Sequence, residues 1–494
     1  MGTVGPGTQP AGASEAEPSC PSAVCRSSAP QPPGTRHTGG RLRTWWWGPS
    51  IAGVAPFLLG ITLLGRAAQN TGLTTYPLVA RQLLGVGNGM LGVVAATSGI
   101  AGVLIAALLA ARITTRSALA AMAAGQAVVL AAFAVLALPT GSGGLWAGAI
   151  ALGAGGGLVF PATMTVIGTA PRPQRARALA VYALALSVGL VAGPLVESGM
   201  LHLLSQSLRG AFGAMAPLPF AATAVSATAA WRFHRGRQAG QQPGRGEAAA
   251  PGPDVPETPT TPTPATPTPT ATPTPTATPT PTTTPTPTTT PTPTTDRPRP
   301  ALLRLPAFRL ALATLLTYQA PFAALLSFGA LLARQADGAR PAGAELGFGV
   351  FFAVSFTVRA TVVAASPIRH RRAALAGSTA ATAAGIALLA IGHGFGAFLV
   401  AMAVLGAPHG LTFPVASAVL ADGVNQADLG RANARLMAST NLVTVLVPLA
   451  CGWLAATVGY RSMFLAVEVP VAVFGAALVL ESRRSVPTGR VPTD

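Results

Sequence analysis

Polar and ionisable side chains interrupt several apolar runs of this sequence, and their types suit ligand binding rather than bond breaking. Arg66 lies midway along the first run, followed by Gln69, Asn70 and Thr74. Positions 66, 70 and 74 share one face at helical spacing. Arg359 and His409 interrupt two later runs. Because such residues are costly in an apolar surrounding and usually face a cavity, we expect them to line a binding site.

Each of these residues has a plainer alternative. Arg66 could donate to helix carbonyls, Arg359 could pack between two helices, and a lone His such as His409 is more often a packing residue. Glu197 and Glu468 lie toward the ends of their runs, where we expect them to be solvated.

Enzyme chemistry has little support in the sequence. Paired carboxylates, His/Cys sets at metal spacing and phosphate-binding loops are not apparent, so we predict no enzyme, no metal and no cofactor. Cys20, Cys25 and Cys451 form neither a disulfide framework nor a zinc site.

Composition points to lipid as the solvent. Half of the 494 residues are hydrophobic and 9% are charged, whereas a soluble protein carries roughly 25% charged residues. The net charge of +18 comes entirely from Arg, in short clusters between apolar runs. These clusters lack the aromatic interleaving of a nucleic-acid surface, so we expect no nucleic-acid partner.

Twelve runs reach the length of about 20 residues that a membrane-spanning helix needs. They are Ile51–Leu78, Met90–Ala111, Ser117–Leu138, Leu145–Ala170, Ala178–Leu201, Gly210–Trp231, Phe308–Ala333, Leu346–Ala365, Ala373–Ile391, Phe395–Ala421, Ala432–Val458 and Met463–Leu480. The predicted fold is therefore an all-α membrane protein with twelve transmembrane helices in two pseudo-symmetric six-helix halves. We predict a disordered cytoplasmic tail at 1–43, halves at 44–232 and 304–484, a cytoplasmic linker at 233–303 and a second tail at 485–494.

Arginine distribution predicts the orientation. With a cytoplasmic N-terminus, the inner segments hold pairs or triplets such as Arg112 with Arg116, and the outer loops hold single residues such as Arg81. We therefore expect a multi-pass protein of the cell membrane, in bacteria the inner membrane, with both termini cytoplasmic.

The linker is of low complexity. Residues 258–295 are nearly pure Thr-Pro, which favours an extended, semi-rigid spacer. A docking or phosphorylation platform is the alternative.

An internal repeat relates the two halves. "GAGGGLVFP" at 153–161 recurs as "GAPHGLTFP" at 406–414, an offset of 253. The same offset pairs "ARQ" at 80–82 with 333–335 and Arg66 with Gln319, which follows Tyr318; an offset of 254 pairs Pro194 with Pro448. Two repeated six-helix units with a substrate between them describe a secondary transporter.

The chain resembles the major facilitator superfamily over about residues 45–484, and within it the bacterial drug and metabolite efflux permeases. The resemblance rests on Phe160-Pro161 ending a glycine-rich fourth span, "RARAL" at 175–179, the ladder Gly189, Gly193 and Pro194, and Phe351-Phe352 before Arg359. It implies alternating access, with helix-shaping or gating roles for Arg116, Gly153, Gly157, Pro161, Gly189, Gly193, Pro194, Gly410, Pro414 and Pro448.

Departures from the family pattern bear on coupling. Thr115 stands where an acidic residue is usual, and Ala149 where proton-coupled drug antiporters carry Arg. The resemblance implies efflux of a small organic compound by a monomer, with proton antiport as the family expectation. Arg66, Arg359 and His409 favour an anionic or neutral compound, because no Asp or Glu lies mid-span in the first, fourth, seventh, eighth or tenth span. Import of an anionic metabolite, or a non-transporting membrane scaffold or sensor, is the alternative.

Overall fold

The computed structural model describes residues 55–109, 112–138, 141–169, 172–240, 302–364 and 371–484, and every regular element in these ranges is helical. The helices are α2 (Ala55–Leu78), α3 (Asn88–Leu109), α4 (Ala118–Ala137), α5 (Gly141–Gly168), α6 (Arg172–Leu203), α7 (Leu208–Met215), α8 (Pro217–Gly240), α9 (Pro306–Gln335), α10 (Pro341–Ala364), α11 (Arg371–Ile391), α12 (Gly394–Gly423), α13 (Gln426–Thr457) and α14 (Gly459–Arg484). A π-helical turn, Val79–Leu83, extends α2, and a 3-10 turn, Leu302–Arg304, precedes α9.

The prediction of twelve membrane helices is confirmed. Eleven helical segments in the described ranges are long and apolar enough to cross a membrane, one of them being α7 and α8 taken together as Leu208–Arg235. The twelfth is α2, whose 24 residues include Arg66, Gln69 and Asn70. These polar side chains lower its mean hydropathy and mark it as a helix that faces protein rather than lipid.

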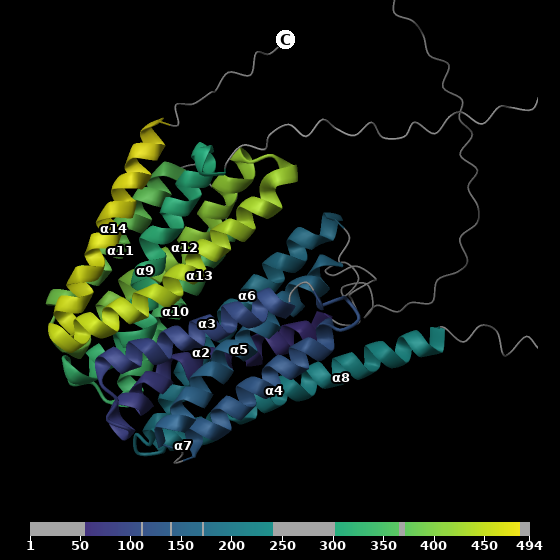
Figure 1. The fold of residues 1–494 in the computed structure, drawn as a ribbon, viewed down its shortest axis with the longest axis horizontal. Coiled ribbons are helices and arrows are strands. Elements are labelled where there is room, and N and C mark those ends of the chain that lie inside the picture. The colour runs from purple at the N-terminus through teal and green to yellow at the C-terminus, as the bar shows by residue number, and fades with distance from the viewer. Residues whose placement is uncertain are drawn as a thin grey trace, which may run out of the picture. The chain divides into compact units, whose positions relative to one another are not determined.

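The helices divide into two halves, α2–α8 and α9–α14 (Figure 1). Within the first half, α5 packs on α3 and α4, and α2 on α6; within the second, α12 packs on α10 and α11, and α9 on α14. Three main contacts join the halves, namely α6 with α10, α3 with α13, and α2 with α9.

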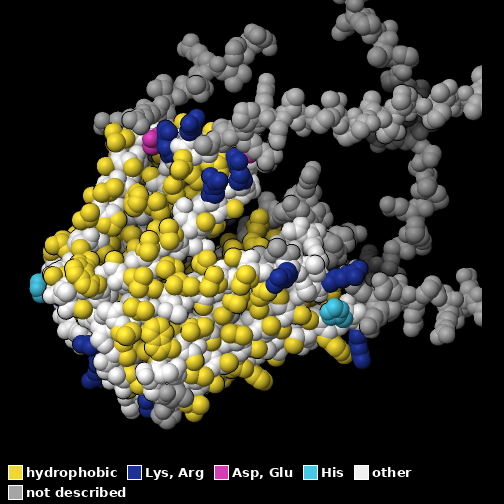
Figure 2. Space-filling model, viewed as in Figure 1, with side chains coloured by type: hydrophobic (Ala, Val, Ile, Leu, Met, Phe, Trp, Pro, Cys, Tyr) yellow, Lys and Arg dark blue, Asp and Glu magenta, His cyan; other side chains and the backbone are white. Residues whose placement is uncertain are grey.

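The outer surface suits a lipid environment. Large apolar side chains such as Leu108, Trp453 and Val469 are more than half exposed, which would be costly in water. Figure 2 shows hydrophobic side chains over most of one face, with Arg side chains toward the two ends of the helices. The chain is therefore a multi-pass membrane protein.

The repeated phrase serves the same packing purpose in both halves. Gly153 and Gly157 of α5 lie against the backbone carbonyls of Ser98 and Gly102 of α3, where a side chain would collide. The equivalent glycines of α12, Gly406 and Gly410, lie in the same way against Phe351 and Ser355 of α10. Small residues allow this close crossing of membrane helices. Both helices continue through their prolines, which are Pro161 in α5 and Pro408 and Pro414 in α12.

One predicted boundary differs from the structure, and several predictions concern residues that the structure does not describe. The helix α8 continues to Gly240, past the predicted end of the first half at 232. The Thr-Pro segment, the N-terminal tail with Cys20 and Cys25, and residues 485–494 lie outside the described residues. For Arg175 and Arg177, the backbone lies in α6 and the side chains are not described.

Candidate functional site

A cavity of about 600 Å³ lies between the two halves. Its walls come from α2, α3, α5 and α6 of the first half and from α9, α10, α12 and α13 of the second. Figure 2 shows a hollow between the halves on the side where their helix ends diverge. The residues predicted for the site that line it are Arg66, Gln69, Asn70, Tyr318, Gln319, Arg359 and His409, with Gly153, Gly157, Pro161 and Pro448 among the helix-shaping residues.

The α2 wall presents Arg66, Gln69 and Asn70. Arg66 NH1 donates to Gln69 Oε1 at 2.7 Å, and its Nε has no hydrogen-bond partner. Asn70 Nδ2 donates to the Leu190 carbonyl of α6 at 3.0 Å. Arg66 therefore donates to a neighbouring side chain rather than to helix carbonyls, and its guanidinium forms no ion pair with any described carboxylate.

Thr74 does not belong to the cavity, so its assignment there is wrong. Its hydroxyl donates to Glu345 Oε2 of α10 at 2.8 Å. Thr74 lies about two helical turns beyond Arg66. Because an α-helix has 3.6 residues per turn, side chains spaced four residues apart move gradually around the helix, and the Thr74 side chain points toward α10 of the other half.

The second half supplies equivalent positions. Gln319, the repeat partner of Arg66, donates from Nε2 to Thr444 Oγ1 at 3.1 Å. The neighbouring Tyr318 hydroxyl is buried without a hydrogen-bond partner.

Arg359 contacts both halves. Its NH1 donates to Ser187 Oγ of α6 at 2.9 Å, its NH2 donates to the His409 carbonyl at 3.4 Å, and its Nε has no partner. The guanidinium lines the cavity and also bridges the halves, so a substrate role and a packing role remain compatible.

An aromatic cluster forms the wall around His409. The His409 ring centroid lies 4.6 Å from that of Phe322, in a stacked arrangement, and 5.1 Å from that of Phe351. Tyr318 and Phe352 both lie at 5.6 Å from the imidazole. Phe322, Phe352 and Tyr318 also line the cavity, which gives it an aromatic wall formed by α9, α10 and α12.

Positive charge dominates the cavity. Among the described residues that line it, Arg66 and Arg359 carry a formal charge, and no Asp or Glu is present. Neither Arg forms an ion pair within the described part of the chain.

The helix-shaping residues lie mainly at helix crossings. Gly189 and Gly193 of α6 face the Leu63 and Ala67 carbonyls of α2, and Pro194 follows within α6. The Pro448 carbonyl of α13 lies against Gly92 of α3. Pro414 is half-buried in α12, outside the cavity wall. Arg116 is exposed, with no hydrogen bond or ion pair to another described residue.

The prediction that Glu197 is solvated is wrong, because its side chain is completely buried between α6 and α2. Glu345 near the start of α10 is buried as completely. The Thr75 hydroxyl lies within hydrogen-bonding distance of both carboxyl groups, 3.3 Å from Glu345 Oε1. Glu468 is half-buried in α14 rather than solvated.

Sequence spacing could have revealed both buried acids. Glu197 follows Gly189 and Gly193 at intervals of four, which places it on the same α6 face toward α2. Glu345 precedes the buried Phe348 and Phe352 at helical spacing on α10. The paired carboxyl groups come from distant parts of the chain, which is why a motif search does not detect them.

Hydrogen bonds between the halves gather at one end of the molecule, where α2 and α6 end and α10 begins. Asn88 Nδ2 donates to the Ala455 carbonyl at 3.1 Å, and Tyr460 OH donates to Asn88 Oδ1 at 2.6 Å. Ser198 Oγ donates to the Ala342 carbonyl at 2.7 Å. We call this end the closed end.

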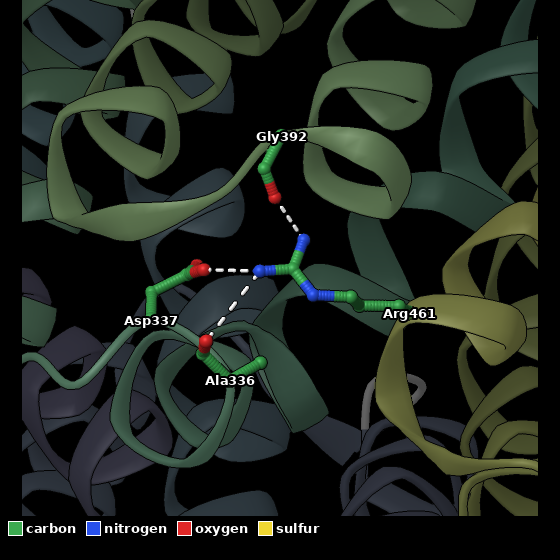
Figure 3. Close-up of polar contacts among 4 residues, drawn as sticks. All are labelled: Ala336, Asp337, Gly392 and Arg461. Carbon is green, nitrogen blue, oxygen red and sulfur yellow. Dashed lines mark hydrogen bonds and ion pairs between the residues drawn. The ribbon is translucent and has the colours of Figure 1, made fainter.

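Loops of the second half are tied together at the closed end by Arg461 (Figure 3). Its guanidinium donates to Asp337 Oδ1 at 2.5 Å and to the Gly392 carbonyl. The Asp337 side chain is 4% exposed. Burial raises the pKa of Asp337, and the positive charge of Arg461 partly offsets that rise.

Two six-helix halves around a polar cavity, built from a repeated sequence, define a secondary transporter by its architecture. The sequence matches the Major Facilitator Superfamily over residues 57–367 and 338–493. The chain belongs to that family, and it is a membrane transporter rather than an enzyme. No curated protein matches the sequence.

Solved transporter structures share the fold. The chain is similar to the nucleoside transporter NupG, with 13% identity, a TM-score of 0.58, and coverage of 86% of this chain and 99% of that one. The peptide transporter POT gives 12% identity, a TM-score of 0.60, and coverage of 87% and 94%. A bacterial homolog of the human lysosomal transporter Spinster, in an inward-facing and occupied conformation, gives 14% identity and a TM-score of 0.56, with coverage of 86% of this chain and 96% of that one. At these identities the likeness concerns the fold alone.

Proposed function

We propose that this transporter exports a small organic anion, or a neutral polar-aromatic compound, by alternating access. The observation that carries the proposal is the pair of guanidinium groups, Arg66 and Arg359, in a cavity whose described lining holds no carboxylate. The alternating movement would occur at the crossings of Gly189, Gly193 and Pro194 with α2 and of Pro448 with α3.

Electrostatics favour an anion in this cavity. An unpaired charge in a site of low dielectric carries a desolvation cost of several kcal/mol, which a bound anion offsets. A cation about 4 Å from one guanidinium would instead be repelled by about 4 kcal/mol at an effective dielectric of roughly 20. Selection against cations follows from the protein's own charges.

The aromatic wall adds a preference for flat molecules. Stacked ring pairs contribute about 0.5–1.5 kcal/mol beyond the area that they bury. Phe322 and Tyr318 line the cavity on the side of His409. A carboxylated aromatic compound would place its charge toward Arg66 and its ring against Phe322.

Orientation and direction rest on the arginine distribution. With both termini in the cytoplasm of the cell, the closed end faces outward and the cavity is accessible from the cytoplasm, as an exporter requires to take up its substrate. Proton antiport would supply the energy. The monomer would be the transporting unit, because the residues that line the cavity all belong to one chain. An importer of anionic metabolites would use the same cavity in the reverse sense.

Ligand-induced thermal stabilisation of the purified protein tests the charge preference, because a bound ligand stabilises the folded state by mass action. We expect organic anions to raise the unfolding temperature and matched organic cations not to. Arg66→Gln should abolish the anion effect, and Arg435→Gln, which changes an exposed Arg of α13 outside the cavity, should preserve it. Stabilisation by cations alone would contradict the proposal. Vesicles with an imposed proton gradient would then separate export from import.

A further inference from the structure

The buried acids Glu197 and Glu345 meet across the contact between the two halves, at the closed end. Glu197 belongs to α6 of the first half and Glu345 to α10 of the second, and both side chains are 0% exposed. Thr74 and Thr75 of α2 hold them, with Thr74 Oγ1 2.8 Å from Glu345 Oε2. Neither carboxyl group lines the central cavity.

The number of hydrogen-bond donors in this cluster is too small unless one of the two carboxyl groups is protonated. The Thr75 hydroxyl lies within hydrogen-bonding distance of Glu197 Oε1 and of Glu345 Oε1, the latter at 3.3 Å. A hydroxyl has one proton to donate, and an ionised carboxylate can only accept. Both contacts are satisfied together only when one carboxyl group is protonated and donates to the Thr75 oxygen.

A second observation places unused polar capacity at the same position. Thr71 Oγ1 and Glu197 Oε2 are buried side-chain atoms without a hydrogen-bond partner in the described part of the chain, and Thr71 is 0% exposed. Thr71 Oγ1 faces α6 at Gly193, one turn before Glu197, since a methyl group at Gly193 would lie 3.1 Å from it. The α2–α6 crossing therefore directs a free hydroxyl toward the acid.

Within the described part of the chain, neither acid has a counter-cation. Besides the two acids themselves, the described charged or titratable side chains on α6, on α10 and on the helices packed against them are Arg66 and Tyr76 of α2, Tyr182 and His202 of α6, Arg209 of α7, Arg309, Tyr318 and Arg334 of α9, Arg359 of α10, and His409 and Asp422 of α12. None of them forms a hydrogen bond or ion pair with either acid. Arg66 lies eight residues before Thr74 on the same helix, about 12 Å along its axis. Two ionised carboxylates side by side without a cation would repel each other strongly.

We infer that Glu197, Glu345 and the Thr71, Thr74 and Thr75 hydroxyls form a proton-binding site that holds the two halves together at the closed end. The proton binds while the acids touch, and it leaves when separation of α6 from α10 lets water reach both carboxylates. The inference rests on the alternating access of the proposed transporter, but not on the charge of its substrate.

Distance measurements between spin labels test the inference without any substrate. Labels replace Leu203, 74% exposed at the end of α6, and the exposed Arg340 just before α10, in a chain lacking Cys20, Cys25 and Cys451. If the closed state binds one more proton than the open state, the ratio of closed to open populations falls about tenfold for each unit of rising pH, over the pH range in which this proton is released. Glu197→Gln with Glu345→Gln should remove this slope and keep the end closed, and Glu468→Gln in α14 is the matched control.

An unchanged slope in the double variant would overturn the inference, and so would a ratio that responds to sodium and not to pH. If the double variant does not fold, infrared titration of the wild-type protein decides, because the inference requires a protonated carboxyl group at neutral pH in the closed state. Absence of that signal would refute it. Failure of organic anions to bind would contradict the proposed substrate and leave the pH slope as an independent result.

Discussion

Leucine at Gly193 should block the exchange between conformations while leaving ligand binding in place. Gly193 lies where α6 crosses α2, and a Cβ atom there would be 2.5 Å from the Ala67 carbonyl oxygen and 3.1 Å from Ala67 Cα. Ordinary contacts between carbon atoms are about 3.5–4.0 Å, so the helices would have to separate by roughly 1 Å. Gly199 on the same helix has no atom within 4 Å of such a Cβ, which makes Gly199→Leu the matched control.

The free-energy cost of the Gly193→Leu substitution can be estimated by comparing it with Gly199→Leu. Overpacking costs about 1–3 kcal/mol, and the upper part of that range applies because the obstacle at Gly193 is backbone, which cannot rotate away. The gain in helix propensity from replacing Gly is common to both variants and cancels. A difference of about 2.8 kcal/mol corresponds to a roughly 100-fold smaller population of the tightly crossed α2–α6 arrangement.

Transport into vesicles and ligand-induced stabilisation measured on the same preparations give the two readouts. We expect Gly193→Leu to lose most transport and to retain ligand-induced stabilisation, and Gly199→Leu to keep both. Wild-type transport by Gly193→Leu would refute the reasoning, and so would an equal loss in the two variants.

Further predictions concern the linker, the closed end and the aromatic wall. Replacing residues 258–295, which contain almost no apolar side chain, with a shorter Gly/Ser linker that still spans the gap should leave transport unchanged; loss of transport with normal insertion would favour a docking role. Arg461→Ala should destabilise the fold by about 1–3 kcal/mol, because it leaves the 4% exposed Asp337 carboxylate without its cation. Since burial raises the pKa of Asp337 above 3.8, the folded state binds the proton more tightly than the unfolded state, and stability should fall as pH rises from that value through the raised pKa. Thermal unfolding measured across this pH range should show that the unfolding temperature falls more steeply with rising pH for Arg461→Ala than for the wild type. Asp337→Asn should show no such fall. Phe322→Ala should weaken binding of aromatic anions about tenfold, as expected for the loss of about 1.4 kcal/mol of stacking, while aliphatic anions bind as before; equal weakening of both classes would argue against stacking.

Sequence patterns predict the architecture well because hydrophobic length and an internal repeat both encode it. Apolar runs of spanning length identify the helices, and the phrase shared by α5 and α12 identifies the two halves. The break between α7 and α8 at Ala216 was not predicted, since the run Gly210–Trp231 is apolar throughout.

The site is only partly readable from the sequence, because a helix shows its periodicity but not its neighbours. Arg66, Gln69 and Asn70 line the cavity, and their part in substrate binding remains a prediction. Thr74 and Glu197 were misplaced because α10, which covers them, is distant in the chain. The contact of Arg359 with Ser187 likewise depends on how the halves pack.

Counterflow of a radiolabelled organic anion into proteoliposomes tests the central claim, that a transporter cavity lined by Arg66 and Arg359 accepts anions. We predict that vesicles loaded with the unlabelled anion accumulate the label transiently, that a matched organic cation does not, and that Arg66→Gln and Arg359→Gln each remove the accumulation while Arg435→Gln retains it. Counterflow of the cation with no counterflow of the anion, unchanged by Arg66→Gln, would contradict the account.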